Sequence, residues 1–151
     1  MLREAITDRM KIALRAKDTR TLSTVRLMMA GLKDRDIAAR GTGNSEGISE
    51  SEIQRMLQGM IKQRRESIEL YEKGNRPELA RQEGEEIAVI ESFLPRQMDD
   101  AGIEAAAKTA IADSGAAGIK DMGKVMALLR ERHAGVIDLA RAGAVVKRLL
   151  S

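Results

Sequence analysis

The segment Phe93-Leu94-Pro95-Arg96-Gln97-Met98-Asp99 divides the chain into two parts of different character. Pro95 has no backbone N–H, and it disfavours the helical conformation of the residue before it, so a helix arriving from the N-terminal side must end here. Asp99 is well placed to cap a new helix, because a short acidic side chain can accept from first-turn N–H groups. The sequence therefore predicts an N-terminal part of residues 1–94 and a C-terminal part of residues 95–151.

The composition favours an all-α protein. Of the 151 residues 43% are hydrophobic, but Tyr71 and Phe93 are the only aromatic residues. A core of Leu, Ile, Val, Met and Ala is typical of packed helices and disfavours a β-sandwich. We expect an all-α, multihelical fold, with a bundle of longer helices followed by a small three-helix subdomain.

Four helices are expected in the N-terminal part, because apolar residues recur there at helical spacing. They are expected from Leu2 to Lys17, through Leu22 to Arg40, from the capping box at Ser49 to Gly74, and from Pro77 onward. The first helix is expected to turn inward Leu2, Ala5, Ile6, Met10, Ala13 and Leu14; the second Leu22, Val25, Met29 and Leu32; and the third Ile53, Leu57, Met60, Ile61, Ile68 and Tyr71.

The glycine-rich segment of residues 41–47 is expected to be a flexible connector. It follows a helix, and it lacks the Gly-Lys-Ser/Thr ending of a phosphate-binding loop. Three shorter helices are expected after Pro95, beginning at N-caps formed by Asp99, Asp121 and Asp138.

No self-contained active site is evident in the sequence. The absence of cysteine excludes disulfides and thiolate chemistry, and His133 is the only histidine, so no two-histidine metal pattern exists. His133 follows a predicted helix, where it fits an interaction with the helix dipole. Asp34 and Asp36 resemble part of a metal-binding loop only superficially, because the apolar residues around them have helical spacing. We therefore assign no catalytic residue, no metal ligand and no cofactor.

The chain has no apolar run approaching the ~18 residues that a membrane span requires, and it opens directly in an amphipathic pattern. We therefore expect a cytoplasmic protein without membrane association. The net charge of +3 is unevenly distributed: +6 over residues 1–65, −7 over 66–113 and +4 over 114–151. This pattern fits attraction to a polyanion, docking between the two parts, or simply solvated helix faces.

Candidate RNA-binding residues occur in three groups. Lys120 and Lys124 flank the helix start expected at Asp121, where N–H groups and the helix dipole favour a phosphate, although Asp121 as the cap would use one donor. The other two groups are the tail residues Arg130, Arg132, Lys147 and Arg148, and the central cluster Lys62, Arg64 and Arg65. For Arg64 and Arg65, ion pairing with glutamates of the following helix is an equally good interpretation. Because aromatic residues are scarce, any RNA contact would be made to phosphates and not by base stacking.

Three motifs, in this order, resemble the GatB/YqeY family. They are Lys62-Gln63-Arg64-Arg65-Glu66-Ser67, Phe93-Leu94-Pro95-Arg96-Gln97-Met98 and Lys120-Asp121-Met122-Gly123-Lys124-Val125-Met126. Members are free-standing bacterial proteins similar to the C-terminal helical region of the GatB component of the glutamyl/aspartyl-tRNA amidotransferase. The family's usual Gly-x-x-Asp-Gly-Lys before the last helix reads Gly135-Val136-Ile137-Asp138-Leu139-Ala140 here, so one expected lysine is missing.

The resemblance implies an all-α protein whose tail contacts tRNA. It also implies association with a carbon–nitrogen ligase that uses glutamine as amide donor, although the residues of the kinase pocket, the zinc site and the glutaminase are not present. Three functions stay open. The favoured one is a non-catalytic accessory protein that binds tRNA or another structured RNA. The others are a protein–protein adaptor of the translation machinery without RNA contact, and participation in amide transfer.

Overall fold

A computed structural model describes residues 1–151 and confirms the all-α fold class, because it contains helices and no strand. The elements, in chain order, are α1 (Leu2–Ala16), α2 (Thr19–Gly41), α3 (Glu50–Lys73), α4 (Pro77–Glu91), α5 (Asp100–Ser114), the short 3-10 helix η1 (Ile119–Asp121), α6 (Met122–Arg132) and α7 (Leu139–Leu150). The chain forms two compact units, Met1–Leu94 and Pro95–Ser151, called below the N-terminal unit and the C-terminal unit.

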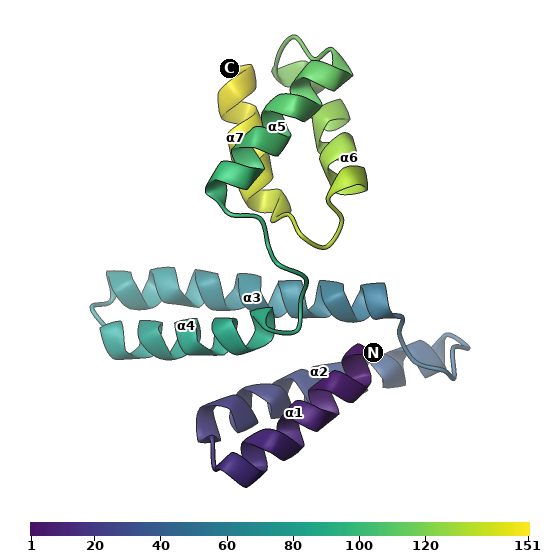
Figure 1. Cartoon of the computed structure of the whole chain (residues 1–151), viewed down its shortest axis with the longest axis vertical. Coiled ribbons are helices and arrows are strands. Elements are labelled where there is room, and N and C mark those ends of the chain that lie inside the picture. The colour runs from purple at the N-terminus through teal and green to yellow at the C-terminus, as the bar shows by residue number, and fades with distance from the viewer. The chain divides into compact units, whose positions relative to one another are not determined.

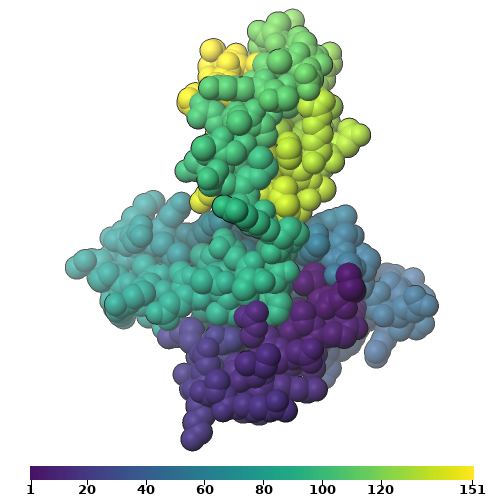
Figure 2. Space-filling view, viewed as in Figure 1, coloured from purple at the N-terminus to yellow at the C-terminus, as the bar shows by residue number.

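The N-terminal unit consists of two helical hairpins, α1–α2 and α3–α4 (Figure 1). The hairpins pack on each other mainly through α2 and α4, and Figure 2 shows the purple side chains of the first hairpin meeting the teal side chains of the second. The fully buried side chains at this junction include Val25, Met28, Leu57 and Ile90. Packing of one amphipathic stripe against another supplies most of the stability of such helices.

The helix ends are set by local chemistry. Asp18 accepts a hydrogen bond from the N–H of Thr21 at 3.1 Å and so starts α2. Ser49 and Glu52 form the reciprocal capping box that starts α3. Pro77 occupies the first position of α4, where its missing N–H costs nothing.

The C-terminal unit is a three-helix bundle of α5, α6 and α7 (Figure 1). Asp99 caps α5 by accepting from the N–H of Gly102 at 2.8 Å. Asp138 caps α7 by accepting from Ala140 and Arg141. The buried core of the unit is small and rich in alanine: Ile103, Ala107, Ala110, Val125, Leu129, Ile137, Ala142 and Val146.

Several residues that we expected in the core are exposed or half-buried, and the residue that is buried instead often lies one residue or one helical turn away. Ala5 and Leu14 of α1 are exposed, and Met60, Ile68 and Tyr71 of α3 are only half-buried. Met28 and Met56, which were not expected in the core, are buried. In α2 and α3 the reason is that each helix contacts more than one neighbouring helix, so the buried surface extends beyond the expected stripe to Met28 and Met56.

Candidate nucleic-acid interface

The loop before α6 positions two lysines in an unexpected way. Asp121 does not cap α6, because its carboxylate turns back and accepts from the N–H of Ala117 at 3.0 Å. The expectation of a side-chain cap at Asp121 was therefore wrong. The reason is conformational: η1 holds Asp121 at φ −93° and ψ 4°, whereas Asp99 and Asp138 have the extended conformation that capping requires.

The first turn of α6 consequently has no side-chain acceptor, and the positive end of its dipole stays uncompensated by a cap. Lys120 lies in η1 and Lys124 in the first turn of α6, and both are exposed. Neither forms an ion pair; the ion pairs of the C-terminal unit are made by Lys108, Arg132, Arg141 and Arg148. The structure thus brings two free ammonium groups to one helix start.

The other basic tail residues do not join this pair. Arg132 forms an ion pair with Asp113 at 2.7 Å, and Arg148 forms one with Glu104 at 3.1 Å. Arg130 and Lys147 are exposed and form no ion pair, but they lie elsewhere. Arg130 is six residues after Lys124, which rotates it by about 240° around α6, and Lys147 belongs to α7.

The central basic cluster is largely neutralised within the N-terminal unit. Arg64 donates to Glu86 at 3.0 Å and is only 12% exposed, and Arg65 pairs with Glu91 at 3.4 Å. Glu86, itself buried, also faces Arg20 at 3.9 Å. These contacts are the ion pairing with the following helix that the sequence allowed as an alternative. Lys62 is the member of the cluster that is exposed and forms no ion pair.

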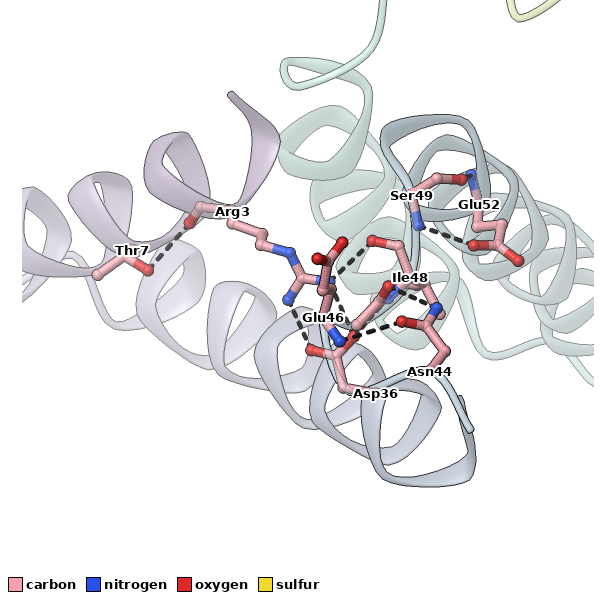
Figure 3. Close-up of polar contacts among 9 residues, drawn as sticks. Arg3, Thr7, Asp36, Asn44, Glu46, Ile48, Ser49 and Glu52 are labelled. Carbon is pink, nitrogen blue, oxygen red and sulfur yellow. Dashed lines mark hydrogen bonds and ion pairs between the residues drawn. The ribbon is translucent and has the colours of Figure 1, made fainter. Parts of the chain in front are cut away.

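The most connected polar group in the N-terminal unit was not expected from the sequence. The guanidinium of Arg3 donates to both carboxylate oxygens of Asp36, at 2.6 and 2.8 Å, and also to the backbone oxygen of Ile48 at 2.9 Å. Asp36 in turn accepts from the N–H of Ile48 at 2.9 Å (Figure 3). We call this set the Arg3–Asp36 latch, because it joins α1, α2 and the segment before α3.

Side-chain hydrogen bonds also connect residues within the glycine-rich segment of residues 41–47. Asn44 donates to the backbone oxygen of Gly47 and accepts from the N–H of Glu46 (Figure 3). The Arg3 guanidinium, together with the hydrogen bond from the N–H of Ile48, lowers the pKa of the Asp36 carboxyl from 3.8 to about 2, and partial burial opposes this shift. Asp36 is therefore a fixed negative charge, already matched by Arg3, which gives it a structural role and leaves it no capacity for acid–base chemistry at neutral pH.

The side chains offer no cluster of three or more His, Asp or Glu groups arranged to hold a metal ion. None of the helices has both the length and the apolar character needed to cross a membrane.

Comparison with known proteins places the chain in a family. The family described as Yqey-like protein matches residues 3–150. Two curated relatives carry the name "Altered inheritance of mitochondria protein 41, mitochondrial", one from Lachancea thermotolerans and one from Vanderwaltozyma polyspora. Each is 33% identical over 85 residues, which is 56% of this chain but only 43% and 44% of those proteins. The aligned segment thus spans less than half the length of these relatives. The family match, in contrast, covers nearly every residue, and the chain belongs to the YqeY-like protein family.

Proposed function

We propose that this YqeY-like protein is a non-catalytic accessory protein that binds structured RNA, with tRNA as the preferred class. The main observation in support of this proposal is that two exposed lysines, Lys120 and Lys124, both lie at the start of α6, which has no side-chain cap. Two exposed ammonium groups, backbone N–H donors and the positive end of a helix dipole together favour one phosphate group.

The mode of binding follows from what these residues offer. Lysine ammonium groups contact phosphates without discriminating bases, and the C-terminal unit has no Phe, Tyr or Trp side chain on which a base could stack. Recognition would therefore depend on the shape of the RNA backbone and on salt concentration.

The test replaces both lysines by alanine. We expect Lys120→Ala/Lys124→Ala to weaken tRNA binding by about 1–2 kcal/mol and to lower the salt slope by about two charges, without changing sequence preference. The thermal midpoint should barely move, because exposed lysines contribute little to folding. The matched control is Lys11→Ala/Lys73→Ala, which removes two exposed lysines of the N-terminal unit that form no ion pair. Equal affinity of both double variants and the wild type would contradict the proposal.

The proposed link to amide transfer has a separate test. The resemblance to the GatB component of the amidotransferase suggests that the protein assists glutamine- and ATP-dependent amidation of charged tRNA. Amidation in cell extract should then fall when the protein is removed and recover when it is added back. Unchanged amidation together with normal tRNA binding would contradict the link to amide transfer and leave the RNA-binding proposal standing.

A further inference from the structure

The N-terminal unit has a groove that the proposed RNA contact does not use. It lies between α2, α3 and α4 and has a volume of about 540 Å³. Its walls are formed by Leu27, Gln63, Arg64, Glu66, Ser67, Leu70, Glu83 and Glu86. We call it the Leu27–Leu70 groove.

The apolar part of the groove consists of two unusually exposed leucines. Leu27 of α2 is 51% exposed and Leu70 of α3 is 68% exposed, and both line the same hollow. Leu27 also borders an adjoining hollow of about 490 Å³, to which Leu22 contributes. Single exposed leucines are ordinary, but two that line one hollow form a small apolar surface that a partner could cover.

The charge of the groove is negative. Arg64 is already paired with Glu86, so its positive charge is cancelled. Glu66 and Glu83 line the same walls and form no ion pair. The C-terminal part of α3 and the whole of α4 are acidic as well, since residues 66–91 contain eight Glu and three Lys or Arg. The pKa of Glu83 is raised, mainly by burial and to a smaller extent by the negative charge of Glu86. The positive charge of Arg64 lowers this pKa, but only enough to offset part of the rise.

We propose that the Leu27–Leu70 groove binds an amphipathic helix of a partner protein, with apolar residues facing the two leucines and Lys or Arg residues facing Glu66 and Glu83. A helix is the occupant that fits a groove flanked by helices, because its i, i+3 and i+4 residues form one apolar stripe. Charge complementarity disfavours RNA and anionic lipid, since both would bring negative charge against unpaired glutamates. The groove thus gives the protein an adaptor surface separate from its basic lysine pair.

The test uses two synthetic helical peptides of equal length and identical leucine spacing. One has lysines beside the leucine stripe, and the other has glutamates at the same positions. We expect the lysine peptide to bind the full-length protein at micromolar concentration by fluorescence anisotropy, and the glutamate peptide to bind at least tenfold more weakly. Amide shifts in a ¹⁵N–¹H spectrum should be confined to residues of α2, α3 and α4 around the groove.

Variants of the full-length chain assign the contact. Leu27→Ser and Leu70→Ser should each weaken lysine-peptide binding at least fivefold, because each removes one apolar wall. Leu14→Ser is the matched control, since Leu14 is 56% exposed on α1 and does not line the groove. Glu66→Gln/Glu83→Gln should weaken binding about fivefold and reduce its salt dependence. Circular dichroism confirms that each variant is folded.

Several results would overturn the proposal. The first is that the lysine peptide does not bind. The second is that Leu14→Ser weakens lysine-peptide binding as much as Leu27→Ser or Leu70→Ser does. The third is that the peptide shifts amide signals outside the groove. Concentration-dependent self-association in sedimentation that Leu70→Ser abolishes would assign the groove to a second copy of the chain and equally overturn it. Loss of tRNA binding in Leu70→Ser would show that the groove belongs to the RNA contact. Failure of the lysine pair to bind tRNA leaves peptide binding unaffected, so the two proposals fail independently.

Discussion

At the scale of single residues, Asp36 lies at the centre of the Arg3–Asp36 latch. Its carboxylate accepts from the Arg3 guanidinium and from the N–H of Ile48, and the same guanidinium reaches the oxygen of Ile48. Three segments that are far apart in the sequence are thus joined by one charged hydrogen-bonded group. Because Asp36 and Arg3 are 18% and 35% exposed, water weakens this ion pair only in part.

The first prediction concerns the pH dependence of the Arg3–Asp36 latch. The pKa of Asp36 is about 2 in the folded chain against an ordinary value of 3.8, so the stabilisation is fully present above about pH 4 and is lost as the pH falls toward 2. Asp36→Asn should be less stable than the wild type by about 1–2 kcal/mol at pH 7. The difference should shrink toward zero at pH 2 in urea denaturation. A difference that stays constant from pH 7 to pH 2 would show that the charge of Asp36 does not stabilise the fold.

The second prediction compares the stability cost of an added Cβ at Gly47 and at Gly43. It has φ +93°, and a Cβ there would lie 2.7 Å from both Arg3 Nη2 and Asp36 Oδ1. Gly43 has nearly the same φ, +94°, but open space around the Cβ position. Gly43→Ala should therefore cost only the backbone strain, about 1 kcal/mol, whereas Gly47→Ala should cost about 1–2 kcal/mol more because it also displaces the latch. Thermal denaturation of the two variants separates these effects, and equal midpoints would refute the contribution of the close contact.

At the scale of helices, the buried face of α3 gives the third prediction. Met56 is 2% exposed in the core, whereas Met60, one turn later, is only half-buried. Met56→Asp should unfold the N-terminal unit, because an unpaired buried carboxylate costs several kcal/mol, roughly. Met60→Asp should be distinctly milder, since its carboxylate can reach water, and Glu85→Ala should have little effect. Circular dichroism melts rank the three variants, and a Met60→Asp melt as low as that of Met56→Asp would contradict the assigned face.

Local chemistry explains which elements could be predicted from the sequence. The helix starts at Ser49, Asp99 and Asp138 depend on side chains within three residues of the N–H groups they satisfy, so the signal is contained in a short segment. Asp121 has the same residue type, but the preceding 3-10 turn directs its carboxylate to Ala117, and nothing in the sequence marks that turn.

Features that join distant segments could not be predicted in this way. Arg3 and Asp36 are 33 residues apart, and a single basic and a single acidic residue on two helices give no pairing signal. The neutralisation of Arg64 by Glu86 was only one of two open interpretations until the α3–α4 hairpin fixed their distance. The Leu27–Leu70 groove likewise depends on three helices meeting, so the leucines look like ordinary helix positions in the sequence.

At the scale of the whole molecule, the core is divided. The buried residues form two separate clusters. The first consists of residues from α1, α2, α3 and α4 together with Leu94. The second consists of residues from α5, α6 and α7 together with Ile137, which lies between α6 and α7. Three of the eight buried residues in the C-terminal cluster are alanine, which removes little apolar area from water. A small bundle with such a core is expected to be the less stable of the two units.

The last prediction tests whether the two units unfold separately. Leu57 and Leu129 are both fully buried, one in each cluster. Replacing either by Ala leaves a cavity and should cost about 2–5 kcal/mol. If each unit depends on its own core, Leu129→Ala should lower hydrogen-exchange protection in α5, α6 and α7 only, and Leu57→Ala in α1 to α4 only. Loss of protection along the whole chain in either variant would mean that the two units unfold together as one cooperative structure.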